Sequence, residues 1–487
     1  MSFELETASD PKGLRRVVID PVSRVEGHGK VTLLLDDDDY VQQARLHIVE
    51  FRGFEKFIQG RPFWEVPVMV QRLCGICPVS HHIAASKAMD MIIGATLTPA
   101  AEKLRRLMHY GQILQSHALH FFHLASPDML FGFDSEVARR NIVGVAAEYP
   151  DIARQGILLR KFGQEVIRIT SGKRVHGTGA IPGGVNKNLS LAEREVLLKD
   201  MAQIIAWSRD AVRLAQKLYE QNVEFYRDFG RYRAKMMSLV RADGAMDLYH
   251  GGLRVRDENG GTLLDHEDYS HYWEHILEEV KPWTYMKFPF LRAIGPEQGW
   301  YRVGPLSRVH NCDFIPTALA DAERLTFKAY DGGSATESTL GYHWARMIEM
   351  LHAAEAIEEL LHDSDLQSDD LMAQGERQGR GVGVIEAPRG TLIHHYRVDD
   401  DDLVIRANLI VSTTHNNQAM NESIRRVAKR HLNGRKITEG LLNHIEVAIR
   451  AYDPCLSCAT HALGKMPLTV ELVDADGGAI DTLTRNA

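Results

Sequence analysis

The sequence predicts a mainly α-helical fold with smaller β parts. Apolar residues recur with the helical period over three long segments, 99–126, 190–227 and 338–362. β-Branched and apolar runs bounded by turn residues occupy two shorter regions, 15–50 and 383–411. We therefore expect a core bundle of long helices, an N-terminal antiparallel meander, and a second small β region around 383–411.

The N-terminal meander is expected because strand-like runs alternate with turn residues. Its β-branched or apolar runs lie at 17–19, 31–35 and 46–49. Gly27 and Gly29 break the first pair of runs, and the acidic run 36–39 stands where a turn is needed. A hard-cation site is an alternative for this run and for 399–402, but both lack EF-type spacing, which favours solvated turns.

Helices are expected to fill most of the region 64–362. One candidate, 79–93, is rich in Ala, Met and Ile, and the next begins after Pro99. Ser190 with Glu193 three residues later matches a capping box that opens a third helix. Two further helices are expected after the second β region, at 418–431 and 436–450.

One large domain is expected over residues 1–461, followed by a C-terminal extension, 462–487. The parts of this domain are the meander 15–50, the mostly helical 64–362, and strands followed by helices over 383–461. In the extension, alternating apolar residues precede a Gly-Gly turn at 477–478, which predicts a hairpin or a loose appendage.

Composition excludes several classes of partner. The net charge of −8 speaks against nucleic acid as the main partner, because phosphate binding needs a basic face. The chain contains no run of about 18 consecutive apolar residues, so no membrane-spanning helix is predicted. The N-terminal segment has no apolar stretch typical of a signal peptide, so we expect a cytoplasmic protein.

The five cysteines carry the strongest chemical signal. Cys74 and Cys77 form one C-x-x-C pair near the N-terminus, and Cys455 and Cys458 form another near the C-terminus. Four thiolates are the donor set that a soft or borderline metal prefers. Binding one metal with both pairs requires the two ends of the domain to meet. Cys312 has no partner nearby and is interpreted as a packed thiol.

A structural zinc site is the main alternative for the two pairs. Zinc sites usually join their C-x-x-C units over about 15–20 residues, whereas these pairs lie hundreds of residues apart. Both pairs run into small apolar segments, which suggests a buried site at a helix N-terminus. Arg72 and Asp453 flank the pairs as candidate outer-shell groups. A thioredoxin-like redox pair is less favoured, because neither pair has a βαβ context.

Six ordered segments resemble the nickel–iron hydrogenase large subunit. Its paired signature matches Arg72-Leu-Cys74-Gly-Ile-Cys77-Pro-Val-Ser-His81 and Asp453-Pro-Cys455-Leu-Ser-Cys458-Ala-Thr-His461. The other matches are Arg24-Val-Glu26-Gly-His28, Phe51-Arg52-Gly-Phe-Glu55, Gly304-Pro-Leu-Ser-Arg308 and Glu386-Ala-Pro-Arg389-Gly390. They run in the family's order over nearly the whole chain.

The resemblance implies a bimetallic site that splits H2 reversibly and heterolytically. All four cysteines would bind nickel. Cys77 and Cys458 would bridge to an iron that carries carbon monoxide and cyanide, and Cys74 and Cys455 would be terminal ligands. A terminal thiolate would take up the proton as H2 is cleaved.

The resemblance also assigns residues around the metals. Glu26 would relay the proton, against the alternative of a surface carboxylate or cap. Arg389 would stand over the open metal face and supply positive charge there, against the alternative of a structural salt bridge, and Asp453 would share its catalytic role. Pro388 and Thr413 would line the pocket of the cyanides, with the Thr413 hydroxyl as a donor. His81 is expected to form a hydrogen bond near the bridging cysteines.

A magnesium site is implied near the C-terminal end of the domain. Glu55 and His461 resemble its side-chain ligands, and the carbonyl of Leu409 would be a third ligand. A lone histidine is more often structural, so the spacing of His461 from Cys458 carries this expectation.

Two departures point to one branch of the family. Ser116 stands where many membrane-linked members have an aspartate, and Val411-Ser-Thr-Thr-His-Asn416 replaces V-P-T-T-W-N. These features and the C-terminal signature resemble the cytoplasmic NAD-reducing group, with coenzyme-F420-linked members close. The resemblance then implies an iron–sulfur small subunit, followed by a diaphorase binding FMN and NAD. This chain has no G-x-G-x-x-G after a strand and is not expected to bind NAD.

The extension after His461 is expected to be removed. Members of this family are trimmed there by a maturation endopeptidase after nickel insertion, and the cut would fall beside Ala462. A permanent C-terminal hairpin is the alternative. For function, the alternatives are a hydrogen-sensing subunit with the same site, a binding protein with a structural four-cysteine zinc site, and a relative within a quinone-reducing complex, which would lack the cysteines.

Overall fold

The computed structural model describes residues 5–460, 468–473 and 479–485. Its N-terminal sheet has the order β1-β2-β3, with strands Arg15–Ile19, Gly29–Leu35 and Val41–Ile48, all antiparallel. The predicted meander is therefore confirmed. Helix α14 (Asn417–His431) packs on β3 and covers the apolar side of this sheet.

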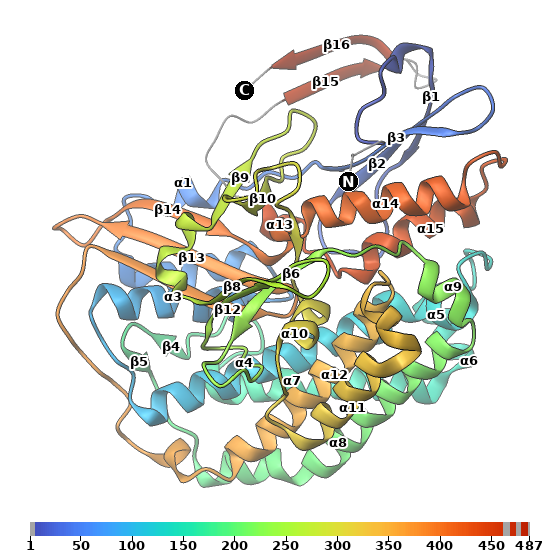
Figure 1. Cartoon of the computed structure of the whole chain (residues 1–487). Helices are drawn as coiled ribbons and strands as arrows, with labels where there is room; N and C mark the ends of the chain where they lie inside the picture. The colour runs from blue at the N-terminus through green and yellow to red at the C-terminus, as the bar shows by residue number, and fades with distance from the viewer. Residues whose placement is uncertain (1–4, 461–467, 474–478, 486–487) are drawn as a thin grey trace.

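The centre of the molecule is a bundle of long helices (Figure 1). Its members are α4 (Pro99–Leu119), α7 (Pro150–Ser171), α8 (Leu191–Glu220) and α12 (Gly341–Leu361). Helices α4 and α7 approach closely because glycines face each other. A Cβ at Gly163 would lie 2.7 Å from both the Gln115 nitrogen and the Gly111 oxygen. The predicted capping box at Ser190 and Glu193 is present at the start of α8.

Two predicted helices end earlier than expected. Helix α4 passes through a π-helical turn, His120–Ala125, into α5 (Ser126–Phe131). Helix α8 ends at Glu220, and α9 (Val223–Asp228) follows. The shorter helices and strands of the same region are α1 (Phe54–Phe57), α2 (Val66–Met69), α6 (Ile142–Glu148), α10 (Pro305–Asn311), α11 (Ala318–Ala329), β4 (Ala180–Ile181) and β5 (Gly184–Val185).

A β-rich part interrupts the region 64–362, which the sequence predicted to be mostly helical. One sheet has the order β11-β6-β7-β8, with bounds Tyr301–Arg302, Lys235–Val240, Gly252–Arg256 and Thr262–Glu267. A second sheet pairs β9 (Ile276–Glu279) with β10 (Phe288–Leu291). The central strand β6 is buried at all six positions, so it shows no alternation that would mark a strand.

The second predicted β region is confirmed as a three-stranded antiparallel sheet. Its strands are β12 (Arg380–Ala387), β13 (Gly390–Val398) and β14 (Val404–Ile410). Helix α3 (Pro78–Ile92) lies directly on β12, where a Cβ at Gly383 would stand 2.0 Å from the Ala84 oxygen. The following helices are α13 (Ser412–His415), α14 and α15 (Glu439–Ala451).

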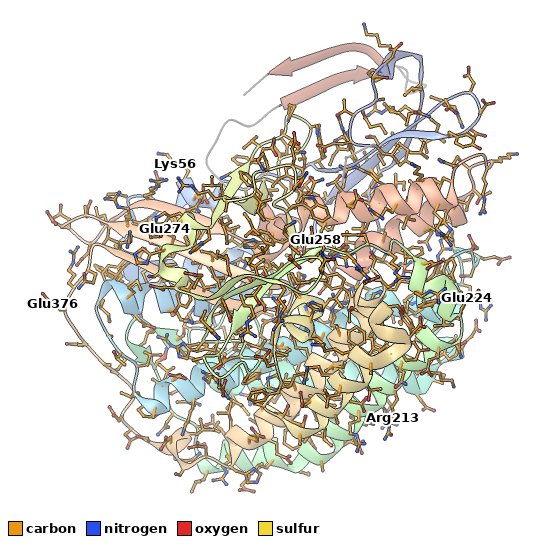
Figure 2. All side chains as sticks on the ribbon, viewed as in Figure 1. Lys56, Arg213, Glu224, Glu258, Glu274 and Glu376 are labelled. Carbon is orange, nitrogen blue, oxygen red and sulfur yellow. The ribbon has the colours of Figure 1, made fainter. Side chains whose placement is uncertain are left out.

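The C-terminal extension contains the hairpin that was one of its two predicted forms. Strand β15 (Leu468–Val473) pairs antiparallel with β16 (Ala479–Arg485), at the edge of the view in Figure 1. Charged side chains such as Arg213, Glu224 and Glu376 project from the periphery (Figure 2). Among the described helices, none combines the length and apolarity needed to span a bilayer.

Candidate metal centre

The two ends of the domain meet at the four thiols. Cys74 and Cys77 lie between a short 3-10 helix, Val70–Leu73, and helix α3. The second pair follows α15, and its Cys458 lies in a 3-10 turn, Ser457–Ala459. The Sγ–Sγ distances are 3.3 Å for Cys74–Cys455, 3.8 Å for Cys77–Cys458 and 2.7 Å for Cys455–Cys458. All four sulfurs lie within 4.8 Å of one another and are buried.

The predicted helix N-terminus is confirmed for one pair only. Cys77 is the N-cap residue of α3, so the positive end of that helix faces the cluster. The second pair instead follows the C-terminal end of α15 and enters a turn of three residues. Small apolar residues after this pair therefore indicated close packing rather than a new helix.

The surroundings of the clustered thiols affect their ionisation unequally. Burial opposes ionisation of Cys74, but hydrogen bonds from Cys455, Cys458 and Cys77 and the charge of Arg389 hold its pKa well below its ordinary value. Burial and contact with the other thiols raise the pKa of Cys455 well above the ordinary value. Burial also raises the pKa of Cys458, together with contacts to Cys74 and Cys77, while its contact with Cys455 opposes that rise. Of these three thiols, the surroundings favour ionisation of Cys74 only, and a cation between the sulfurs would favour ionisation of Cys455 and Cys458.

Glu26 lies against the cluster. Its Oε2 is 3.0 Å from the Cys455 Sγ and accepts a hydrogen bond from the Ser457 backbone N–H at 3.2 Å. The backbone holds it there, because the Leu456 N–H donates to the Glu26 carbonyl oxygen at 3.0 Å. Gly27, at a φ of +83°, allows this approach, since a Cβ there would stand 2.7 Å from the Ser457 nitrogen.

Arg389 and Asp453 form a buried ion pair beside the thiols. Arg389 Nε–H donates to the Asp453 carbonyl oxygen at 2.5 Å, and its Nη2 donates to Oδ1 at 3.1 Å. Arg389 Nη1 is buried and has no hydrogen-bond partner among the described residues. Burial raises the pKa of Asp453, and the charges of Arg389 and Arg346 oppose that rise. The guanidinium also interacts electrostatically with Cys455, Cys77 and Cys74.

A small cavity of about 10 Å³ adjoins the thiols, and His81, Pro388, Arg389 and Thr413 line it together with Cys77 and Cys455. The Thr413 Oγ1 accepts a hydrogen bond from the Cys455 N–H at 2.9 Å, which leaves its hydroxyl proton free to donate elsewhere. The His81 Nδ1 lies 3.1 Å from the His394 Nε2. The predicted lining residues are therefore together in space.

The predicted magnesium ligands are partly in view. Glu55 is buried, and its Oε1 accepts a hydrogen bond from the Leu409 N–H at 2.7 Å. The carbonyl oxygen of Thr460 accepts from the Arg52 N–H at 2.9 Å, so the chain reaches this region just before residue 461. His461 itself lies outside the described residues.

Cys312 and Ser116 are buried away from these contacts. The Cys312 Sγ is 3.8 Å from the Val309 oxygen, and burial raises the pKa of this thiol to about 12. It is the packed thiol that the sequence predicted. Ser116 is also buried, and its Oγ has no hydrogen-bond partner in the described part of the chain.

A buried network to which the sequence assigned no role supports the segment of Arg389. Arg308 on α10 donates to Glu349 from Nε at 2.5 Å and to Glu386 from Nη1 at 2.7 Å. The same guanidinium donates to the carbonyl oxygens of Ala387 at 3.0 Å and Pro388 at 3.4 Å. The sequence identified the segments Gly304–Arg308 and Glu386–Gly390 as family matches, but it did not show that these two segments contact each other.

Replacing Arg308 with methionine is expected to destabilise the fold by about 3–5 kcal/mol, because two fully buried carboxylates lose their counter-charge. Burial opposes ionisation of Glu349, yet Arg308 and His117 lower its pKa from 4.5 to about 2. The stabilisation that ionised Glu349 contributes is therefore complete above pH 4.5 and is lost as the pH falls toward 2. Burial raises the pKa of Glu386, so this second carboxylate does not add to that contribution. Chemical denaturation at several pH values measures this difference.

The matched control is Arg241→Met, whose ion pair with Asp243 is exposed to solvent and is expected to contribute little to stability. The difference in the free energy of unfolding between Arg308→Met and the wild type should become smaller at acidic pH, because protonation neutralises the carboxylates that the variant leaves unpaired. Equal stability of the two variants at pH 7 would contradict the assigned role of the network.

The donor set and its surroundings fit a nickel and iron pair. Four buried sulfurs converge within 4.8 Å, and the positive charge of Arg389 alone cannot balance four thiolates. The adjoining cavity leaves room beside the thiols for a small additional ligand, as an open metal site requires.

Comparison with known proteins identifies the family. The family model described as nickel-dependent hydrogenase matches residues 52–131 and 248–461, and a model described as HoxL-like matches residues 16–51. The NAD-reducing hydrogenase HoxS subunit beta of Cupriavidus necator is 50% identical over 97% of this chain and 100% of its own. One subunit of the F420-non-reducing hydrogenase of Methanothermobacter thermautotrophicus is 40% identical over 96% of this chain and 99% of its own.

Solved structures agree with this assignment. An NAD+-reducing [NiFe]-hydrogenase in the H2-reduced state superposes with a TM-score of 0.91 at 61% identity, covering 92% of this chain and 99% of that chain. The Ni-Fe-Se hydrogenase of D. vulgaris Hildenborough shares the fold, with a TM-score of 0.74 at 22% identity over 92% and 100%. This chain belongs to the nickel-dependent hydrogenase family, as a nickel–iron hydrogenase large subunit.

Proposed function

We propose that this chain cleaves H2 reversibly and heterolytically into two protons and two electrons and delivers the electrons toward NAD. The observation that carries the proposal is the Glu26 carboxylate, which lies 3.0 Å from the Sγ of one of four converging thiols. Such a contact gives a thiol proton a direct acceptor.

The chain's residues divide the work around the metals. When bound, nickel and an iron carrying carbon monoxide and cyanide supply Lewis acidity and take up the electrons. Cys74, Cys77, Cys455 and Cys458 would hold nickel, with Cys77 and Cys458 shared with iron. Cys455 would accept a proton from H2 and pass it to Glu26.

The other residues around the site would orient the reacting groups and exclude water. Arg389 would present the free Nη1–H to the open face of the site while Asp453 holds its other nitrogens. Pro388 and the Thr413 hydroxyl would form the walls for the diatomic ligands, and His81 would hydrogen-bond near the bridging thiolates. This enclosure excludes water and strengthens each charge interaction.

Magnesium is proposed at Glu55, the Leu409 carbonyl and His461. The support is that Glu55 is buried beside Leu409 and that Thr460 is anchored to Arg52. A buried carboxylate at the end of the domain suits a hard cation.

Electron transfer requires partners, because the cysteines of this chain are used by the proposed centre and by packing. We infer an iron–sulfur small subunit, followed by a diaphorase that binds FMN and NAD. The support is the 50% identity to a subunit of an NAD-reducing hydrogenase. We also infer a cytoplasmic location, which suits NAD as the electron acceptor.

The extension 462–487 is proposed to be removed by a maturation endopeptidase after nickel insertion. Thr460 is already buried and anchored, so the chain up to that residue is committed to closing the site. Protein from nickel-supplied native cells should end beside Ala462 by intact mass, and protein from nickel-depleted cells should keep the tail. A full-length chain in both samples would contradict the proposal.

Metal analysis of the native protein tests the function itself. Nickel and iron in equal amounts, with infrared bands of carbon monoxide and cyanide, are the expected result. Zinc alone on a tail-bearing chain from nickel-supplied cells would favour the zinc-binding alternative. Intact metals with very slow turnover would favour a hydrogen-sensing subunit.

A further inference from the structure

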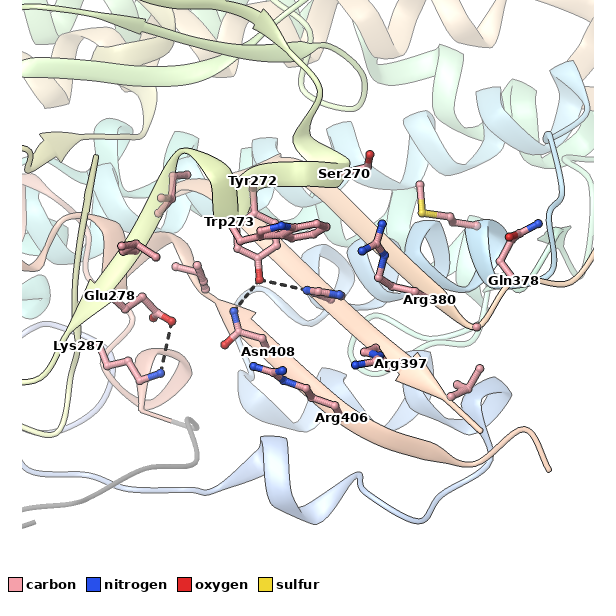
Figure 3. Close-up of a pocket in the computed structure, with 17 residues that line it drawn as sticks. Ser270, Tyr272, Trp273, Glu278, Lys287, Gln378, Arg380, Arg397, Arg406 and Asn408 are labelled. Atoms are coloured by element: carbon pink, nitrogen blue, oxygen red, sulfur yellow. Dashed lines mark hydrogen bonds and ion pairs between the residues drawn. The ribbon is translucent and has the colours of Figure 1, made fainter. Parts of the chain in front are cut away.

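A cleft of about 1210 Å³ lies on the face of the β12–β14 sheet that points away from helix α3 (Figure 3). The segment from Ser270 to Glu278 walls one side of it, and the outer ends of the three strands form its floor. None of the predicted site residues lines this cleft. The volume is sufficient for a small organic ligand.

Three arginines stand side by side on the floor of the cleft. Arg380 pairs with Arg397 in the β12–β13 register, and Arg397 pairs with Arg406 in the β13–β14 register. Directly opposite residues point to the same face, so this arginine row (Arg380, Arg397 and Arg406) crosses all three strands. Figure 3 shows all three side chains in the cleft.

The arginine row is costly to the isolated chain. Like charges directly opposite each other on a sheet are destabilising. Within the described residues, no carboxylate forms an ion pair with any member of the row, and the nearby Glu278 pairs with Lys287 at 3.3 Å. Arg380 is held instead over the Trp273 ring, 4.6 Å from its centre. An anion in the cleft would relieve this repulsion.

His395 stands in the same cleft and contacts the Tyr272 and Trp273 rings. Its Nδ1 lies 3.3 Å from the Tyr272 hydroxyl oxygen, which accepts a hydrogen bond from the Asn408 Nδ2 at 2.7 Å. The His395 Nε2 is buried and has no hydrogen-bond partner in the described part of the chain. Burial and the charges of Arg380, Arg406 and Arg397 lower the pKa of His395 to about 4, which keeps the ring neutral.

We propose that this cleft binds a diphosphate group, held by the arginine row. Neighbouring strands are about 4.8 Å apart, so the row spans about 10 Å and presents several guanidinium forks. Phosphate oxygens match these forks in bidentate geometry, and one carboxylate would satisfy only one of them. The concave walls favour a small molecule over a flat protein surface.

The diphosphate has two chemical sources, inorganic pyrophosphate and a nucleoside diphosphate. Trp273 and Leu277 in the wall of the cleft offer apolar surface to the organic part of a nucleotide. Titration calorimetry of the assembled, metal-loaded enzyme with pyrophosphate and with ADP distinguishes them. Tighter binding of ADP assigns the nucleotide, and equal binding assigns the inorganic anion.

The variant that tests the site is Arg397→Gln, the central member of the row. It should weaken binding of both probes by about tenfold or more, because a charged bidentate contact is lost. The control is Arg213→Gln on α8, far from the arginine row. Arg213 is exposed and forms an ion pair with Asp210, so this variant should bind the probes like the wild type.

Thermal stability gives an independent readout. Without ligand, Arg397→Gln should melt about 1 °C higher than the wild type, because repulsion in the row is removed. Pyrophosphate should raise the Tm of the wild type, and at the same concentration it should raise that of the variant less. No binding of either probe to the wild type would overturn the proposal. Loss of partner subunits from the variant without anion binding would overturn it too and assign the row to an acidic protein surface instead.

Discussion

The Cys458→Ser substitution is expected to remove both metals from the chain and to abolish hydrogen turnover. The Cys458 Sγ lies 2.7 Å from the Cys455 Sγ and 3.8 Å from the Cys77 Sγ, so it contributes to any ion bound between the two pairs. A serine hydroxyl does not ionise at neutral pH and is a poor donor to a soft metal. Substitution of residues that hydrogen-bond to metal ligands typically lowers metal affinity or activity by about 10–100-fold, and loss of a ligand itself should have a larger effect.

Elemental analysis of Cys458→Ser measures this effect directly, alongside hydrogen-dependent dye reduction. The matched control is Cys312→Ser, which changes the same atom in a buried thiol away from the cluster. The control should keep nickel, iron and turnover, because its new hydroxyl can donate to the Val309 oxygen. Normal nickel content in Cys458→Ser would refute the four-thiol assignment.

The Glu26→Gln substitution should lower turnover by about 10²–10⁴-fold while nickel and iron stay in place. The amide keeps the size of the side chain but cannot accept a proton from the Cys455 thiol. The Ser457 N–H can still donate to the amide oxygen, so the local backbone should be preserved. The loss should therefore appear in proton transfer and not in metal binding.

Isotope exchange between H2 and D2O separates these two effects, because it reports proton release at the centre. Glu446→Gln is the control nearby, since its Oε1 accepts a hydrogen bond from the Ser23 N–H at 2.6 Å and an amide oxygen can do the same. Glu26→Asp should recover part of the exchange through its shorter carboxylate. Full exchange activity in Glu26→Gln would show that protons leave by another route.

Local patterns were sufficient for the thiol pairs and for most helices. The spacing of each C-x-x-C pair places two sulfurs together without any help from the rest of the fold. Helix α8 begins where its capping box predicted, because Ser190 and Glu193 satisfy each other's backbone donors. The meander and the second β region were recoverable because their strands end at turn residues.

Strands without alternation were not recoverable. Strand β6 is buried at every position, and the neighbouring strands β7 and β8 pair with each other through register irregularities. A continuous apolar run does not distinguish a buried strand from a helix segment. Only packing against the rest of the core decides between the two.

Short-range spacing and ordered motifs were enough to predict the two thiol pairs, the family and the helix-rich core. The tertiary structure decided which distant groups meet: Glu26 with Cys455, Arg308 with Glu349 and Glu386, and the three arginines across one sheet. The physical reason is that strand register and helix packing set these distances. Those depend on the whole core closing at once, and no local pattern records them.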